Sequence, residues 1–300
     1  MRESFLPGAL RYPDAQDGRC ALGQVTIRAG MKIGVFDSGY GGLTIFEKIR
    51  ERLPAYDYIY LGDNARTPYG NRSFDAILKF TTEGIDYLVA GQCKIIIIAC
   101  NTASAKALRS IQQKVLPDRY PDRRVLGIIR PSVEEIGRFS KTRTVALWAT
   151  EGTVKSMSFV LEMEKFAPEV RLIQQSCPML VPLVEAGELS GAGVDYFIEK
   201  YWTLTSKKSD RIDTLLLACT HYPLLLPRIR AIVPPEVRIV IQASIVAPSL
   251  VDYLRRHSEI ETTLSRGGSA EFLTTDHTDG FDQLAEIFLG HPVSSKNVEL

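Results

Sequence analysis

The sequence predicts an α/β protein built on parallel sheets and divided into two related domains. Short apolar runs alternate with longer amphipathic ones from Met31 onward, which is the pattern of repeated strand and helix units around a parallel sheet. Two of the apolar runs, IIII at residues 95–98 and LLLA at 215–218, carry no polar residue, as expected for strands buried on both faces. Each run leads into a cysteine, in IIIIACNTASA and TLLLACTHY. This echo favours two pseudo-symmetric α/β domains.

The periodicity places strands and helices in turn along the chain. Leu43, Phe46 and Ile49 recur at helical spacing, so that one apolar face runs through residues 43–53. The expected strands are residues 32–36, 58–61, 95–99, 125–129, 144–149, 170–173, 215–218 and 237–241. The expected helices are residues 43–53, 74–89, 103–115, 156–166 and 249–257.

Composition and charge exclude several classes of protein. A chain of 300 residues with 45% hydrophobic and 24% charged residues is typical of a globular enzyme. The net charge of +1, with Lys and Arg spread along the chain, argues against binding to nucleic acid or to an anionic membrane. Because no apolar stretch is long enough to span a bilayer, we expect a cytoplasmic protein.

Residues 1–30 form a leader with no sustained helical or strand period. They also lack the uninterrupted apolar core of a signal peptide. Strand-like sequence begins abruptly at Met31. We therefore expect the leader to be disordered or to precede the true start of the protein, with a regulatory arm as the alternative.

The five cysteines, Cys20, Cys93, Cys100, Cys177 and Cys219, are odd in number and irregularly spaced. No C-x-x-C pair occurs among them, which argues against a disulfide framework and against a zinc site. We expect free thiols and no bound metal. Cys93 precedes a strand and Cys177 lies in an apolar stretch, so both are interpreted as packing residues.

The segment FDSGYGGL, residues 36–43, joins the first strand to the first helix by a glycine-rich turn. Its glycines are spaced G-x-G-G and not G-x-G-x-x-G, so we interpret the turn as an anion-binding loop and not as a dinucleotide site. Asp37 lies at the carboxyl end of the strand, where α/β proteins bind ligands. A helix N-cap is the alternative interpretation of Asp37. Asp63 ends the next strand in the same way.

The cysteine of each repeated segment follows a buried strand and precedes an expected helix. At a helix N-terminus the macrodipole favours the thiolate, so Cys100 and Cys219 are each placed to act as a base. A single cysteine in this position is more often a small buried hydrophobe. Two cysteines in matching contexts favour catalysis, because a racemase needs one acid or base on each face of a tetrahedral carbon.

Polar residues beside both cysteines strengthen this interpretation. Asn101 and Thr102 follow the first cysteine, and Thr220 and His221 follow the second. Their amide and hydroxyl groups are suited to holding a carboxylate, and the His221 imidazole to moving a proton. Glu185 closes the apolar run PMLVPLV and is expected either in the cleft or on a solvated helix position.

Six motifs in order closely resemble those of bacterial glutamate racemases, within the cofactor-independent aspartate/glutamate racemase superfamily. The motifs are FDSGYGGLT, LGDNARTPYG, ACNTASA, ATEGTVKS, CPMLVPLVE and LLLACTHYPLL. The resemblance runs from Met31 to about Leu254, with a looser echo to the C-terminus, and leaves out the leader. Departures from the family pattern are GYGG in place of GVGG, and residues 242–247, QASIVA, where many relatives carry an acidic residue.

The resemblance implies two α/β domains with the active site at their interface. The first lobe is expected to comprise residues 31–125 and 236–300, and the second residues 126–235. By the resemblance, Cys100 and Cys219 are the catalytic pair, Asp37 and His221 assist them, and Asp63 and Glu185 are further active-site carboxylates. The implied substrate contacts are Asp37, Ser38, Tyr69, Gly70, Asn101, Thr102, Thr220 and His221.

The family resemblance also implies partners and cellular role. The family uses neither pyridoxal phosphate nor a metal, takes glutamate as its substrate and supplies D-glutamate for peptidoglycan. Many members are homodimers, so a homodimer is an expectation here. The alternatives are an aspartate racemase, a non-enzymatic protein that binds DNA gyrase, and a redox thiol protein, the last weakened by the absence of a nearby resolving cysteine in the sequence.

Overall fold

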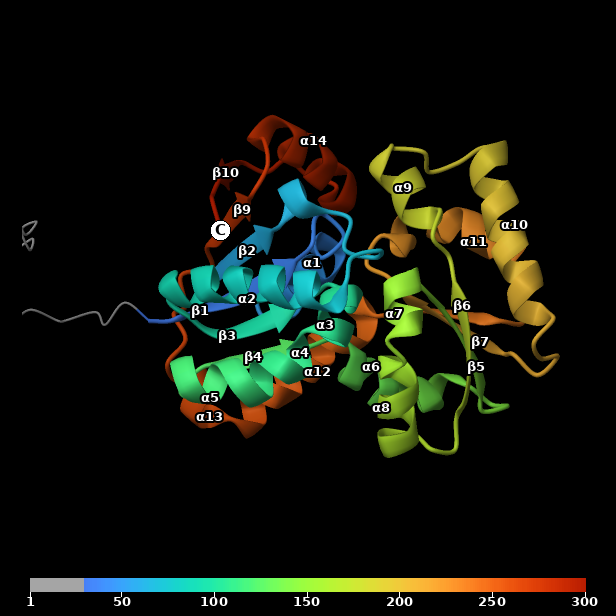
Figure 1. The fold of residues 1–300 in the computed structure, drawn as a ribbon, viewed down its shortest axis with the longest axis horizontal. Helices are drawn as coiled ribbons and strands as arrows, with labels where there is room; N and C mark the ends of the chain where they lie inside the picture. Colours follow the sequence, from blue (N-terminus) through green and yellow to red (C-terminus); the bar gives the residue numbers. More distant parts are fainter. Residues whose placement is uncertain (1–29) are drawn as a thin grey trace, which may run out of the picture.

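The computed structural model describes residues 30–300, which form two lobes, each built on its own sheet (Figure 1). The leader of residues 1–29, including Cys20, lies outside the described residues. The first sheet has six strands in the order β10-β9-β2-β1-β3-β4, and the second has four in the order β6-β5-β7-β8. Every strand pair is parallel. All carboxyl strand ends of a sheet therefore lie at one edge.

The strands of the first sheet come from both ends of the described chain. Its strands are β1 (Lys32–Asp37), β2 (Tyr58–Gly62), β3 (Cys93–Ile98), β4 (Arg124–Gly127), β9 (Ala270–Thr274) and β10 (Ser295–Asn297). The second sheet comprises β5 (Thr144–Ala149), β6 (Arg171–Ser176), β7 (Thr214–Ala218) and β8 (Arg238–Ile241). The central strands β1, β3, β5 and β7 are almost wholly buried, as their unbroken apolar runs predict.

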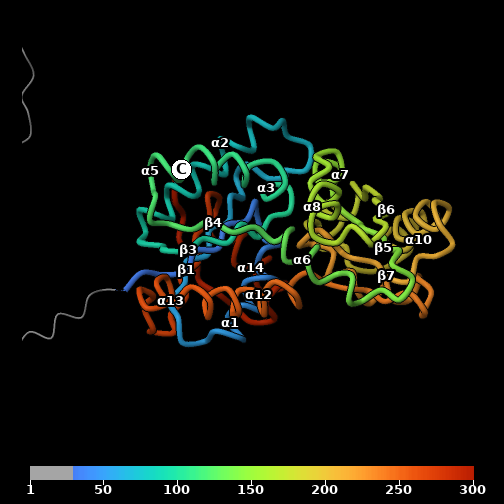
Figure 2. Tube along the Cα trace, turned by 90° about the horizontal axis from the view of Figure 1, so that it is seen from below, coloured from blue at the N-terminus to red at the C-terminus, as the bar shows by residue number. Residues whose placement is uncertain are grey.

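Helices cover both faces of the first sheet (Figure 2). One face packs against α1 (Leu43–Arg52), α12 (Ala243–Arg256), α13 (Ser258–Glu261) and α14 (Thr278–Leu289). The other face packs against α2 (Phe74–Ala90), α3 (Asn101–Lys106), the π-helix η2 (Ile111–Val115) and α5 (Leu116–Arg119), with α4 (Leu108–Ser110) between them.

The second sheet is covered in the same manner. One face packs against α9 (Leu180–Glu185), α10 (Ala192–Ser206), the 3₁₀ helix η4 (Tyr222–Leu225) and α11 (Leu226–Ile232). The opposite face packs against α6 (Ile129–Ile136), η3 (Gly137–Phe139), α7 (Glu151–Lys155) and α8 (Ser158–Phe166). One further 3₁₀ helix, η1 (Asn64–Arg66), follows β2.

Several expected bounds differ from the structure. The predicted helix over 103–115 is a series of shorter pieces, and the predicted strand over 125–129 ends at Gly127 because α6 begins at Ile129. The helix expected over 156–166 begins at Ser158, and the one over 249–257 begins earlier, at Ala243. The division at residue 236 also needs correction. Since β8 pairs with β7, residues 238–241 belong to the second sheet and not to the first lobe.

Gly84 of α2 allows this helix to approach the first sheet. A Cβ atom at this position would lie 2.3 Å from Cε2 of Phe36 on β1. We expect Gly84→Ala to lower the free energy of unfolding by about 1–3 kcal/mol, because the methyl group would overpack the core. Gly280→Ala is the matched control: it adds a methyl group to α14, where nothing lies within 4 Å, and should change stability by less than about 1 kcal/mol. Urea denaturation measures both, and a Gly84→Ala variant as stable as the parent would contradict this packing.

Candidate active site

The site forms where the carboxyl ends of the two sheets meet. Cys100 follows β3 and Cys219 follows β7, and each is 6% exposed. Contacts between the lobes close the site: the Thr44 hydroxyl lies 3.3 Å from the carbonyl oxygen of Thr220, and the hydroxyls of Thr102 and Thr150 lie 3.0 Å apart. The structure thus brings together residues that are distant in sequence, as the repeated segment predicts.

The glycine-rich turn after β1 fits closely against the second lobe. A Cβ atom on Gly41 would lie 2.3 Å from Oγ1 of Thr220 and 2.5 Å from Nδ1 of His221. Asp37 is wholly buried, and its Oδ2 accepts a hydrogen bond from the Gly39 N–H at 3.0 Å. Asp37 is not the N-cap of α1, a position that Gly42 occupies. Burial raises the pKa of Asp37, against the opposing effect of nearby His221. Ser38, also buried, completes this side of the site.

Cys100 is the N-cap of α3, and its Sγ accepts a hydrogen bond from the Ala103 N–H at 3.4 Å. The predicted lowering of its pKa by the helix is nevertheless wrong. Burial raises the pKa of Cys100 to about 12, and the neighbouring Asp37 carboxylate adds to this effect, while Ser38 and the Ala103 N–H oppose it. Desolvation by the second lobe outweighs the helix terminus, so Cys100 is a protonated thiol at neutral pH.

Cys219 has a different environment. The chain after β7 enters the 3₁₀ helix η4, and α11 begins only at Leu226, so the expected α-helix N-terminus at this cysteine is absent. Instead, Sγ of Cys219 lies 3.9 Å from Nδ1 of His221. Nε2 of the same ring lies 3.2 Å from Oε1 of Glu185 at the end of α9. These three groups form a chain in which a proton can move.

The electrostatics of His221 follow from this chain. Burial acts to lower its pKa, but the hydrogen bonds with Cys219 and Glu185 raise it to about 10. The ring is therefore an imidazolium at neutral pH. The sequence allowed Glu185 to lie either in the cleft or on a solvated helix position. Its contact with His221 places it in the site. The ring also packs edge-on against Phe288 of α14, at a centroid distance of 5.7 Å.

Asn101, Thr102 and Thr220, beside the two cysteines, are all buried at the interface of the lobes. Two threonines missed by the sequence reasoning, Thr150 and Thr153, join them, since the Thr102 hydroxyl lies 3.0 Å from that of Thr150 and 3.4 Å from that of Thr153. Thr150 directly follows β5 and N-caps α7. The sequence did hold a signal for both threonines, because β5 is a buried strand that is followed by polar residues in ATEGT, as β3 and β7 are followed by polar residues after their cysteines.

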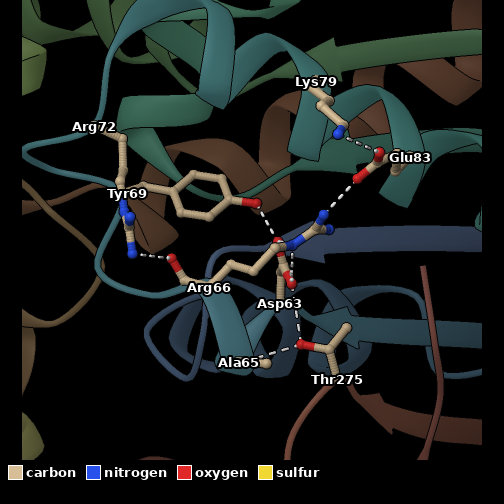
Figure 3. A network of polar contacts seen from close by, with 8 residues as sticks. All are labelled: Asp63, Ala65, Arg66, Tyr69, Arg72, Lys79, Glu83 and Thr275. Atoms are coloured by element: carbon tan, nitrogen blue, oxygen red, sulfur yellow. Dashed lines mark hydrogen bonds and ion pairs between the residues drawn. The ribbon is translucent and has the colours of Figure 1, made fainter.

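Asp63 and Tyr69 lie in a separate network of polar contacts (Figure 3). The Tyr69 hydroxyl donates to the Asp63 carboxylate, Arg66 Nε lies 2.7 Å from Oδ2, and the Thr275 hydroxyl lies 3.0 Å from Oδ1. Arg66 also pairs with Glu83. Asp63 thereby anchors the turn that carries Gly70 to the second lobe, where Gly70 lies close to Thr150. A direct role of Asp63 in proton transfer stays a prediction.

Residues 30–300 contain neither a metal-binding cluster nor a membrane-spanning helix. No group of three or more His, Cys, Asp or Glu side chains in this range is arranged to hold a metal ion. None of the helices in the same range has both the length and the apolar character needed to cross a membrane.

Comparisons with known proteins identify the family. A sequence model of the Asp/Glu/Hydantoin racemase family matches residues 33–247. The chain belongs to this family. It is therefore an isomerase of the racemase class, and the predicted resemblance to glutamate racemases is confirmed. The glutamate racemase of Paracoccus denitrificans is 38% identical over 275 residues, which cover 88% of this chain and 98% of that relative.

Solved structures agree with this assignment. The chain resembles glutamate racemase isoform RacE1 of Bacillus anthracis with a TM-score of 0.82 and 30% identity, over 91% of this chain and 99% of that chain. It also resembles the Francisella tularensis glutamate racemase, solved in complex with D-glutamate, with a TM-score of 0.79 and 30% identity, over 90% of this chain and 98% of that chain. The predicted class, two parallel-sheet α/β domains, is confirmed.

The raised pKa of His221 predicts a specific effect of Glu185→Gln. Removing the anionic partner should lower the pKa of His221 from about 10. The raised pKa of His221 stabilises the folded protein fully at pH values below 6.5, the ordinary pKa of histidine. This stabilisation is lost as the pH rises through about 10, the pKa of His221 in the folded protein. The variant lacks part of this stabilisation and should therefore be less stable than the parent near pH 7. The difference from the parent should shrink above pH 10. Imidazole NMR measures the pKa, and urea denaturation at several pH values measures the stability.

Glu188→Gln provides the control, because Glu188 is an exposed carboxylate on the same part of the chain. It should leave the titration of His221 unchanged. An unshifted His221 pKa in Glu185→Gln would show that this carboxylate does not hold the imidazolium.

Proposed function

We propose that this racemase interconverts L- and D-glutamate by moving a proton at Cα between Cys100 and Cys219. The observation that carries the proposal is the placement of two buried cysteines at the ends of β3 and β7, one from each sheet, with a different assisting group beside each. The names of the relatives supply the substrate. One cysteine removes the Cα proton as a thiolate, and the other delivers a proton to the opposite face as a thiol.

On the first side, Cys100 needs a base before it can act as one. With a pKa raised to about 12, its thiol does not ionise unaided at neutral pH. We assign Asp37 to this task, because its charge acts directly on Cys100 and burial raises its own pKa, bringing the two proton affinities closer. When Cys100 has accepted the Cα proton of one enantiomer, it is a thiol again, and Asp37 keeps the proton that it took from Cys100 until that proton is released to solvent.

On the second side, His221 governs the proton of Cys219. An imidazolium held by Glu185 stabilises a neighbouring thiolate, so Cys219 can accept the Cα proton of the other enantiomer. When Cys219 acts as the acid, it donates its proton to Cα and the resulting thiolate is again stabilised by His221. The roles of the two cysteines exchange in the reverse reaction.

Hydrogen-bond donors hold the substrate's carboxylates in this scheme. Ser38, Asn101, Thr102 and Thr220 are buried and border the two cysteines, and Thr150 and Thr153 extend the set. Removing a proton next to a carboxylate places enolate-like charge on its oxygens. Donors fixed in a dry site stabilise this charge without reorganisation, and we assign them much of the reduction in the barrier. The reaction so described needs neither pyridoxal phosphate nor a metal.

The cellular role follows from the proposed product. D-Glutamate made in the cytoplasm would supply peptidoglycan synthesis and thereby cell-wall formation and cell shape. The homodimer stays a prediction. Binding to DNA gyrase gains no supporting observation from residues 30–300.

Single cysteine variants test the two-base scheme. Cys100→Ser and Cys219→Ser should each lose racemisation by about 10²–10⁴-fold or more, because a hydroxyl is a far weaker base than a thiolate. Each variant should still exchange the Cα proton of one enantiomer with solvent, and the two variants should differ in which one. Polarimetry and NMR in D₂O measure both properties.

Cys93→Ala is the matched control, because Cys93 is equally buried but lies at the start of β3, away from the site. It should racemise at the parental rate. Near-parental racemisation by either Cys100→Ser or Cys219→Ser would refute the scheme.

Glutamate and aspartate distinguish the proposed substrate from the main alternative. Because the two differ by one methylene group, they place the distal carboxylate differently against a fixed set of donors. We expect kcat/KM to be at least about 10-fold higher for glutamate, measured in both directions with each pure enantiomer. A higher value for aspartate would reassign the protein to the aspartate racemases.

A further inference from the structure

A reciprocal pair of buried amides links the site to the chain connection between the lobes. Asn101 Nδ2 donates to Oε1 of Gln242 at 2.6 Å, and Gln242 Nε2 donates to Oδ1 of Asn101 at 3.1 Å. Asn101 is 3% exposed and Gln242 is 2% exposed. Neither the sequence reasoning nor the proposed mechanism gave Gln242 a role.

The surroundings of Gln242 determine which way its amide faces. The Ser132 hydroxyl donates to the Ile128 carbonyl at 2.7 Å, so its oxygen is left to accept a hydrogen bond. Gln242 Nε2 lies 3.0 Å from this oxygen and 3.5 Å from the Ile128 carbonyl oxygen, and both of these atoms act as acceptors. The NH₂ group of Gln242 must therefore face α6, which turns Oε1 toward the NH₂ group of Asn101.

This arrangement in turn fixes the Asn101 amide. Its Oδ1 is occupied by Gln242, and one of its two N–H groups is used by Oε1. The orientation of the amide is thereby fixed, and its second N–H is left without a partner among these contacts. This N–H can donate to a carboxylate oxygen.

Gln242 also lies at one of the two places where the chain crosses between the lobes, and it contacts the other. Gln242 follows β8 and directly precedes α12, where the chain returns to the first lobe. Ile128 directly precedes α6, where the chain enters the second lobe after β4. Gln242 therefore joins both crossings to the residue that follows the catalytic cysteine.

We propose that Gln242 is a positioning residue that fixes the orientation of the Asn101 amide, so that its second N–H can donate to a substrate carboxylate. The proposal deepens the function above and rests on it. Gln242 acts only through Asn101, and the Ile128 carbonyl and Ser132 hydroxyl set its orientation. The amide of Asn101 is thereby preorganised, so substrate binding and proton transfer do not have to orient it.

A double-mutant cycle on kcat/KM for glutamate tests this proposal. Gln242→Leu keeps the volume but leaves the Asn101 amide buried without its partner, and should lower kcat/KM by about 10–100-fold. The loss should fall on the same parameter, kcat or KM, as in Asn101→Ala. In the Asn101→Ala background, Gln242→Leu should lower kcat/KM by a further factor of less than about 3, because the amide that Gln242 positions is no longer present.

The matched control is Gln175→Leu, which removes a similarly buried amide from β6 in the second sheet, outside the site. It should keep the parental kcat/KM even if its thermal unfolding midpoint falls. If Gln242→Leu does not fold, Gln242→Glu replaces it. This isosteric change cannot donate to Asn101, and should cost about 10-fold in the parent and less than about 3-fold with Asn101→Ala.

The outcomes separate the two proposals. A parent that does not racemise glutamate would refute the proposed function. If the parent is active, two results would refute the positioning role alone. One is a Gln242 variant that keeps the parental kcat/KM, and the other is a Gln242 variant that lowers kcat/KM by the same factor in Asn101→Ala as in the parent.

Discussion

Desolvation of the polar groups between the two sheets is the constraint on which the rest of this structure depends. At the interface of the lobes, Asp37, Cys100, Cys219 and His221 have almost no contact with water. A buried polar or charged group is costly unless it finds a partner. Many contacts at the site meet this requirement, from the chain of Cys219, His221 and Glu185 to the paired amides of Asn101 and Gln242. Oδ1 of Asp37 is an exception, since it has no hydrogen-bond partner among the described residues.

The two sides of the site are chemically different despite the similar sequences at the two cysteines. Burial raises the pKa of Cys100 to about 12 and the neighbouring Asp37 carboxylate adds to this effect, so Cys100 is a thiol. Sγ of Cys219 lies 3.9 Å from Nδ1 of His221, whose pKa is raised to about 10. The proposed proton transfer therefore has a different assisting group beside each cysteine, Asp37 on one side and His221 on the other. The apparent symmetry of the sequence therefore conceals a division of labour.

The sequence predicted the architecture well where local pattern determines structure. The unbroken apolar runs located β3 and β7, and the amphipathic spacing located α1 and α2. It failed where structure depends on distant partners. The strands β9 and β10, with the short sequences AEFLT and SKN, were missed because only pairing with β2 and with each other makes them strands.

The site shows the same limit. The cysteines and their immediate neighbours were readable from the repeated segment, because strand ends of a parallel sheet share one edge. The raised pKa of Cys100 could not be predicted, because the sequence shows that a helix begins at this cysteine but does not show how deeply the folded protein buries it. Thr150, Thr153 and Gln242 were missed for a related reason: their roles arise only when α7 and α12 meet the end of β3.

The most direct test of the central claim follows hydrogen at Cα in the intact protein. Purified protein is incubated with L-glutamate in D₂O, and both enantiomers are isolated at early conversion. Transfer between two thiols predicts that nearly every D-glutamate molecule carries deuterium at Cα, while the recovered L-glutamate retains its protium. Formation of D-glutamate that keeps the original proton would show that one base serves both faces, and the account of two opposed cysteines would be wrong.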